Sequence, residues 1–408
     1  MNKIVFIFYV ILLIFGANGR KKSKKKDSGV SSWEMSSYKY LDMRGKLRKS
    51  LFVVNALDHS DNNTICSPIS ALLPLGKLAL GAVSTSLEEL LEGIGVISQK
   101  KIKSHFKRLI AELRYLPGVK LDIASRLYVG HQTKLTSSFD SDTKEIFNSS
   151  VDRVDFESPV TTAEIINAWV ESQTANMIHD MLSADDITPE TSLIMINAIY
   201  FNGKWETPFN NVQTSTFHTP SDVRRITMMS TTAHFNYTDS EVLDAQILRL
   251  PYIGGTASFV IILPKARNGL SLLLSQIKLA PEILDSALGT MSEHNVQVTL
   301  PKFKLAAEMD LRKLYERIGI KRIFNKYESG LSGIERGKTV FVSKAKQKAV
   351  IEVNEHGTEA AASSATSTVK LSLVKTVQFR ADHPFLFIVM SHTQQLFAGT
   401  LVHPAIVK

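Results

Sequence analysis

The sequence predicts an α+β fold, built as one large domain that begins after about residue 40. Amphipathic helical patterns dominate the first half of the 408-residue chain and strand-like runs the second half, without strict alternation. No stretch rich in proline, glycine or serine separates two halves. Apolar residues make up 44% and charged residues 21%, which is typical of a globular chain rather than a disordered or collagenous one.

Helices are expected where apolar residues recur every three to four positions and so form one apolar face. These segments are 51–57, 70–80, 87–93, 102–116, 139–147, 162–181, 270–277 and 311–318. Gly93 and Gly95 are plausible stop signals, because glycine readily adopts the left-handed conformation that closes a helix.

Strands are expected in short runs rich in β-branched and aromatic residues. These runs are 192–201, 257–263, 296–300, 339–343, 349–353, 384–390 and 395–402. The run 192–201 is apolar at both odd and even positions, so both of its faces should be buried. We therefore predict that it is a central strand.

Residues 1–19 have the pattern of a secretory signal peptide. Lys3 precedes an apolar run at 4–15, and small residues occupy Ala17 and Gly19, where a signal peptidase reads the chain. This run is shorter than the ~20 apolar residues that span a membrane. No later segment is a candidate span, so we expect a secreted, extracellular protein whose mature chain starts near Arg20.

Positive charge is concentrated in residues 20–26, within a basic extension (20–44) that we expect to be disordered by self-repulsion. The whole chain has 48 basic and 39 acidic residues; without Lys3 and the six cations of 20–26, 41 basic residues remain. The body, 45–408, is therefore almost neutral, and no nucleic-acid-binding surface is predicted. The extension either binds polyanions such as heparin-like glycans or acidic membrane surfaces, or only aids solubility.

The predicted helix at 102–116 and the residues just before it carry a row of cations opposite their apolar face. Lys100, Lys103, Lys107 and Arg114 fall within about 60° of each other on a helical wheel. This row is a candidate site for a sulfated glycan. The alternative is an ordinary solvated helix face.

A single cysteine, Cys66, excludes internal disulfides and cysteine-based metal clusters, and we predict that it is buried. Three asparagines begin sequons for N-glycosylation: Asn62, Asn148 and Asn236. We find no motif for a metal or cofactor and predict none. No G-x-S-x-G elbow, H-E-x-x-H, Walker loop or G-x-G-x-x-G occurs, so we expect the chain not to be an enzyme.

The most informative segment is 355–378. Two strand-like runs flank it, and 357–368 contains no large apolar residue, so this stretch cannot anchor a core. A loop longer than about 12–15 residues is usually functional or disordered. Small Ala, Ser and Thr side chains then give way to Val369, Lys370 and Leu371, which protease specificity pockets accept. The segment therefore resembles an exposed protease bait, with a disordered linker as the alternative.

The run 354–362 (NEHGTEAAA) resembles the hinge of inhibitory serpins, and other segments match that family in order. They are 66–70 (CSPIS), 197–205 (NAIYFNGKW), 331–334 (LSGI), 382–387 (DHPFLF) and 396–399 (LFAG). The resemblance covers about residues 45–407. It implies a serpin fold: a large central, mostly antiparallel sheet with smaller sheets, about eight to nine helices clustered in the N-terminal half, and an exposed C-terminal reactive loop.

The resemblance implies a monomeric suicide inhibitor of serine proteases. In such serpins the protease attacks the loop and forms an acyl-enzyme. The cleaved loop then inserts into the central sheet and distorts the protease before it deacylates. The hinge would comprise Glu355, Gly357, Thr358, Glu359, Ala360, Ala361 and Ala362. The small hinge residues favour insertion of the loop and therefore an inhibitory function. The alternative functions are a non-inhibitory carrier or a glycan-bound extracellular protein.

In inhibitory members of the family the hinge glutamate is usually the seventeenth residue before the cut. Counting Glu355 as the first of these seventeen residues makes Leu371 the last, which predicts the bond Leu371–Ser372. Leucine there would select chymotrypsin-, cathepsin-G- or elastase-like proteases. The runner-up is Lys370–Leu371, which would select trypsin-like enzymes. A cut after Lys375 would need an atypically long loop.

Five further residues match polar sites of the family. Ser67, Ser70 and Asn197 resemble its "shutter" network, and Trp205 resembles its "breach" tryptophan. Gln347 stands where that network often has a histidine. Glutamine can donate and accept hydrogen bonds but does not titrate, so the network would lose any pH response. Glutamine at this position is familiar in arthropod serpins.

Overall fold

The computed structural model describes residues 61–336, 340–356, 376–392 and 394–406. They belong to one compact unit, Met43–Lys408. The expected signal peptide, the basic extension, the helix at 51–57 and residues 357–375 lie outside the described residues. Among the helices of the described part, none is long and apolar enough to cross a membrane.

The smaller of two sheets has five strands in the order β10-β11-β4-β2-β3. Their bounds are β2 Val119–Gly130, β3 Val151–Val154, β4 Leu193–Gly203, β10 Phe303–Asp310 and β11 Val342–Val353. The sheet is mixed, because β11 pairs with β4 and β2 with β3 in parallel, whereas the other two joins are antiparallel.

The larger sheet has nine strands in the order β1-β14-β13-β8-β7-β6-β9-β12, with β5 paired to β6. It is mostly antiparallel, and only β12 and β9 run parallel. The bounds are β1 Thr64–Cys66, β5 Asn211–His218, β6 Val223–Ser240, β7 Ala245–Pro251, β8 Ala257–Pro264, β9 Ser292–Pro301, β12 Val377–Arg380, β13 Phe385–Ser391 and β14 Gln395–Leu401.

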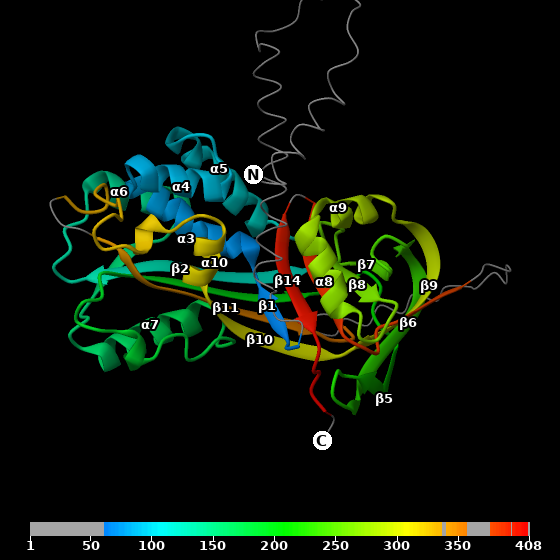
Figure 1. The fold of residues 1–408 in the computed structure, drawn as a ribbon. Coiled ribbons are helices and arrows are strands. Elements are labelled where there is room, and N and C mark those ends of the chain that lie inside the picture. Colours follow the sequence, from blue (N-terminus) through cyan, green and yellow to red (C-terminus); the bar gives the residue numbers. More distant parts are fainter. Residues whose placement is uncertain (1–60, 337–339, 357–375, 393, 407–408) are drawn as a thin grey trace, which may run out of the picture. The chain divides into compact units, whose positions relative to one another are not determined.

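The described residues form eight α-helices, close to the number expected. They are α3 Pro68–Gly81, α4 Ser84–Ile94, α5 Gln99–Arg114, α6 Ser137–Phe147, α7 Pro159–Gln173, α8 Leu270–Leu279, α9 Glu282–Gly289 and α10 Leu311–Arg317. Helices α3 to α6 cover one face of the five-stranded sheet and α7 covers the other (Figure 1). Gly95 ends α4 with φ 80°, the left-handed conformation predicted for a glycine stop.

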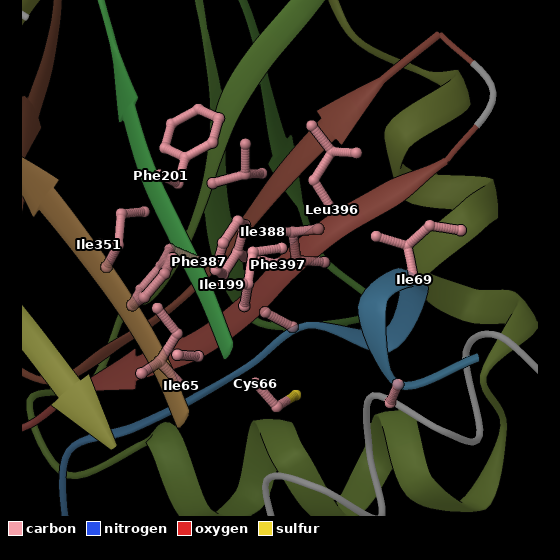
Figure 2. Packing of buried hydrophobic residues seen from close by; sticks show 14 of the residues in the cluster. Ile65, Cys66, Ile69, Ile199, Phe201, Ile351, Phe387, Ile388, Leu396 and Phe397 are labelled. Atoms are coloured by element: carbon pink, nitrogen blue, oxygen red, sulfur yellow. The ribbon is translucent and has the colours of Figure 1, made fainter. Parts of the chain in front are cut away.

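The prediction of a central, doubly buried strand at 192–201 is confirmed. Every residue of β4 is buried, and β4 is the middle strand of its sheet. Ile194, Ile196 and Tyr200 face the core beneath α7. Ile199 and Phe201 belong to the main core, where Phe201 meets Phe397 of β14 at 5.5 Å between ring centroids (Figure 2).

Cys66 is buried at the end of β1, beside that core, as predicted (Figure 2). Burial raises the pKa of its thiol to about 12, because the thiolate would lose its hydration. The thiol is therefore protonated and unreactive at neutral pH.

Three sequence predictions of secondary structure differ from the structure. The helix predicted at 162–181 ends at Gln173, because Ala175 and Asn176 adopt φ of 50° and 59°. The two strands predicted at 339–343 and 349–353 are one strand, β11. Several elements were not predicted: β1, β2, β3, β5, β6, β7, β10, β12 and α9. Strands such as β6 and β10 expose one face to solvent, so polar residues interrupt their apolar runs.

Candidate functional site

The join between β11 and β4 is the centre of the candidate site. These two strands pair in parallel over ten residue pairs, from Val342↔Leu193 to Glu352↔Asn202. Near the middle, Gln347 lies opposite Asn197, and both side chains point toward the N-terminus of α3. The residues predicted to form the shutter therefore meet across this join.

Gln347 bridges the two strands and the helix. Its amide nitrogen lies 2.9 Å from Asn197 Oδ1, 3.0 Å from the Ser67 carbonyl oxygen and 3.0 Å from Ser70 Oγ. Its carbonyl oxygen accepts from the Ser67 backbone N–H at 2.9 Å. An amide nitrogen carries two hydrogens, so these three acceptors share them. Gln347 thus makes these hydrogen bonds without a titrating group.

Asn197 binds the first turn of α3. Its Oδ1 accepts from Ser70 Oγ at 2.6 Å, and its Nδ2 donates to the Ser70 carbonyl at 2.9 Å. In a regular helix that carbonyl would accept from the N–H of residue 74, but residue 74 is proline and has no N–H. Asn197 therefore supplies the hydrogen bond that Pro74 removes from the helix. All of these groups are buried.

Ser67 is the N-cap of α3 and accepts from the Ser70 N–H at 3.3 Å. Its hydroxyl donates to the Leu396 carbonyl of β14 at 2.6 Å, which ties the helix to the larger sheet. The network separates naturally into two halves. Gln347 has two bonds to the Ser67 backbone and Asn197 has two bonds to Ser70, while the bonds from the Gln347 amide nitrogen to Asn197 Oδ1 and Ser70 Oγ join the two halves.

Trp205 lies two residues beyond the end of β4, where it is buried in an aromatic cluster. It stacks on Tyr252 at 4.6 Å between centroids and makes edge contacts with Phe209 and Phe259. Its indole N–H donates to the Asn354 carbonyl at 2.7 Å. The tryptophan therefore holds the chain just beyond β11, next to the predicted hinge.

Glu355 is the last hinge residue with a described contact. Lys302, between β9 and β10, forms an ion pair with the Glu355 carboxylate at 2.9 Å. The backbone carbonyl of Glu355 accepts a hydrogen bond from the Phe209 N–H at 3.0 Å. Partial burial opposes the charge on Glu355, but the Lys302 ammonium outweighs it and lowers the carboxyl pKa. Gly357, Thr358, Glu359, Ala360, Ala361 and Ala362, together with Lys370, Leu371 and Ser372, lie outside the described residues.

An ion cluster on the α7 side of the sheet was missed by sequence reasoning. Asp186, in the short 3-10 helix Ala184–Asp186 that follows α7, lies 2.6 Å from both Lys344 and Lys346 of β11. Lys346 also pairs with Glu308 of β10 at 2.7 Å. The period-two alternation of 344–348 (KAKQK) was the available signal, because it places both lysines on one face of a strand.

Asp186→Asn is expected to destabilise the fold at neutral pH by about 2 kcal/mol, because it removes charge-assisted hydrogen bonds. Burial disfavours the carboxylate, but its bonds to Lys344 and Lys346 outweigh this and lower its pKa. A carboxyl group whose pKa is lower in the folded state stabilises the fold at pH values above its unfolded pKa. This stabilisation is lost as the pH falls through the folded pKa. Thermal unfolding of both proteins from pH 7 to pH 2 should therefore show the difference shrinking below about pH 4. A constant difference would contradict the ion-pair explanation.

The predicted cation row lies on α5, and two of its members are paired to acids of α6. Lys103 lies 2.5 Å from Asp142, and Lys107 lies 2.6 Å from Glu145. Lys100 and Arg114 are exposed near opposite ends of the same helix. The row therefore presents less net positive charge than its sequence indicates.

The three sequon asparagines, Asn62, Asn148 and Asn236, all have exposed side chains. Asn148 caps the C-terminus of α6 in the left-handed conformation. No group of three metal-ligating side chains occurs in the described ranges.

Comparison with known proteins places this geometry in a family. A family model described as "Serpin (serine protease inhibitor)" matches residues 47–404. The chain is 34% identical to antichymotrypsin-2 of Bombyx mori, over 87% of this chain and 95% of that protein. It is 32% identical to antitrypsin of the same organism, over 86% and 91%. The crystal structure of Serpin48 from Tenebrio molitor superposes with a TM-score of 0.80 at 29% identity, covering 90% of this chain and 99% of that one.

These matches correct one expectation. The lack of enzyme motifs led to the prediction that the chain is simply not an enzyme. However, the matched family consists of serine protease inhibitors, and such inhibitors act as suicide substrates. The family match over most of the chain and the shared fold lead to one conclusion: the chain belongs to the serpin family.

Proposed function

We propose that this serpin is a secreted suicide inhibitor of serine proteases, with 355–378 as its bait loop. The observation that carries the proposal is the parallel β11–β4 join, closed by a network in which the Gln347 and Asn197 amides each bind the first turn of α3. The relatives named antichymotrypsin and antitrypsin support the same function.

The topology explains how a loop that follows β11 could enter this join. The loop leaves the C-terminal end of β11, so a strand that folds back along the sheet runs antiparallel to β11. Because β11 and β4 are parallel, the same strand also runs antiparallel to β4. Insertion would replace one parallel join by two antiparallel joins, which are slightly more stable per residue. The native state would then be held by a kinetic barrier.

The proposed reaction begins as ordinary proteolysis. The serine hydroxyl of the protease attacks the carbonyl carbon of Leu371, the C–N bond to Ser372 breaks, and the amine of Ser372 leaves with the proton. The result is an ester between the protease and Leu371. Insertion of the segment before Leu371 then carries the protease away and distorts its active site before water cleaves the ester.

The direct test mixes the mature protein with chymotrypsin-, elastase- and trypsin-like proteases, followed by denaturing gels and mass spectrometry. The proposal expects an SDS-stable complex and a released peptide that begins at Ser372. A peptide that begins at Leu371 would keep the mechanism but move the cut to Lys370–Leu371. Clean cleavage without a complex, and without a gain in heat stability, would instead favour a non-inhibitory carrier.

Leu371→Arg is expected to redirect the inhibitor. The rate of complex formation should fall at least about 100-fold with chymotrypsin-like enzymes, because a charged side chain enters an apolar pocket, and should rise with trypsin-like enzymes. Lys370→Ala is the matched control and should leave both the chymotrypsin-like rate and the Ser372 peptide unchanged. If Lys370→Ala abolishes inhibition instead, the cut lies one residue earlier.

We also propose that the signal peptide 1–19 directs secretion, that Asn62, Asn148 and Asn236 accept glycans, and that the cations of 20–26 bind heparin-like glycan. The ion pairs of Lys103 and Lys107 favour the extension over α5 as the main glycan contact. Deleting residues 20–26 should lower the salt concentration at which the protein elutes from heparin. The double substitution Lys100→Ala with Arg114→Ala should lower this concentration less. The opposite order would assign the contact to α5.

A further inference from the structure

A cavity of about 390 Å³ opens at the edge of the five-stranded sheet, away from the β11–β4 join. Strand β3 pairs only with the last four residues of β2, 127–130. Residues 121–126 of β2 therefore form a sheet edge with no strand beside it in the described part of the chain. The cavity lies along this edge, between the C-terminal half of α5 and the end of α7. Its volume falls in the range of small-molecule sites, roughly 300–1,000 Å³.

A buried cation lies in this cavity. Lys77 of α3 is only 1% exposed, and its Nζ donates to the Ser125 carbonyl at 2.5 Å and to Ser149 Oγ at 2.9 Å. An ammonium group carries three hydrogens, so these bonds leave one donor. Burying a charge without a counter-charge is costly. The pKa of Lys77 is lowered to about 7, first by burial and then by the charge of Arg126.

Three further polar atoms in the cavity lining are buried without a hydrogen-bond partner in the described residues. They are Ser125 Oγ, Arg126 Nε and Trp169 Nε1. All three can donate, and two can only donate. Buried polar atoms are rarely left unpaired in folded proteins, so this cluster of donors indicates an acceptor from outside the chain.

The charge balance of the lining favours a monoanion. Lys77, Arg114 and Arg126 line the cavity, and no carboxylate is among the described lining residues. Asp152 already pairs with Arg126 at 2.5 Å. The buried charge that remains is that of Lys77, and one negative charge balances it. Most of the other lining residues are apolar, among them Leu113 of α5 and Ile123 of β2, whereas Asn148, Ser149 and Gln173 are polar.

We propose that this cavity binds a small carboxylate with an apolar chain, whose carboxylate accepts from Lys77, Arg126 and Trp169 while its chain lies along α5. A medium-chain fatty acid such as decanoate has this chemistry. The site involves neither the bait loop nor a protease, so its test is independent of the proposed inhibition.

The test is calorimetric titration of the unglycosylated protein with decanoate, because Asn148 lies at the cavity lining. We expect one bound decanoate per chain. Decanol, which lacks the charge, and acetate, which lacks the chain, should each bind at least about tenfold more weakly. Absence of saturable decanoate binding, or equal binding of decanol, would overturn the proposal.

Lys77→Met tests the headgroup contact. The variant should bind decanoate at least about tenfold more weakly and no longer distinguish it from decanol. It should fold, because Ser149 Oγ still donates to the Ser125 carbonyl at 3.0 Å. Ile110→Trp fills the cavity without changing its charge and should also abolish binding. Lys120→Met is the control, because Lys120 lies on β2, the strand that borders the cavity, but does not line the cavity. Unchanged affinity in the Lys77 or Ile110 variant would refute the site.

The pH dependence gives a further check that a structural role of Lys77 would not produce. The charged groups that act on its ammonium are those of the Arg126–Asp152 pair, and Arg114 of α5 lines the same cavity. The bound anion favours protonated Lys77, so affinity should fall as pH rises through 7. Between pH 6.5 and 8.5 the loss should approach about 25-fold, and Lys77→Met should abolish it. A flat profile would contradict the assignment.

Discussion

Thr358→Arg is expected to turn the inhibitor into a substrate of its protease. In an inserted strand alternate side chains face opposite sides, and Glu359 is expected to face solvent. Thr358 would then face the buried side of the sheet. An arginine there would bury an unpaired charge, which costs several kcal/mol and slows insertion. Hydrolysis of the ester would overtake the trapping step.

The measurement is the number of inhibitor molecules consumed per protease molecule inhibited. It should be near one for the original protein and rise more than about tenfold for Thr358→Arg, with cleaved loop in place of complex on gels. Glu359→Arg is the matched control, because it places the same side chain one residue later on the solvent face. Equal inhibition by both variants would mean that the loop does not insert in this register.

Asn197→Ala is expected to destabilise the native fold by about 3 kcal/mol, the largest stability effect among our predictions. The substitution leaves the Ser70 carbonyl without a donor, because Pro74 offers no N–H, and it also removes an acceptor shared by Ser70 and Gln347. These groups are all buried, so water cannot replace the lost bonds at little cost.

A double-mutant cycle with Pro74→Ala tests this explanation. Alanine at position 74 restores an N–H four residues after Ser70, so the cost of Asn197→Ala should be smaller by about 1 kcal/mol in that background. Denaturant unfolding of the four proteins gives the coupling free energy. Simple additivity of the two substitutions would show that Asn197 does not compensate for the proline.

The sequence was sufficient to predict the residues of the β11–β4 network but not all of their partners. Ser67, Ser70 and Asn197 were identified from short motifs and Gln347 from its place in the family resemblance, and the structure brings the four together. Lys302 and Asp186 were missed because their contacts depend on strand register, and Asp186 meets Lys346 across 160 residues of sequence. No local pattern encodes such a distance.

The same limit applies to the fold. Buried elements such as β4 and α3 have continuous apolar patterns that local reasoning detects. Strand β6 alternates buried and exposed residues irregularly along Val223–Ser240, so its polar face concealed it. The end of α7 depends on two left-handed residues, Ala175 and Asn176, which are neither glycine nor proline.

The separable network has a kinetic consequence. Strands β11 and β4 are bound to the same turn of α3 through Ser67 and Ser70, so parting them breaks at least the bonds from Gln347 to Asn197 and to Ser70 Oγ. The side-chain contribution to the activation barrier is thus at least two buried hydrogen bonds, on the order of 2 kcal/mol. Amides do not ionise, so this contribution is the same in acidic and neutral surroundings. The rate at which the β11–β4 join opens would therefore not change with pH through this network. In a network that contains a histidine, the rate would change as the histidine is protonated.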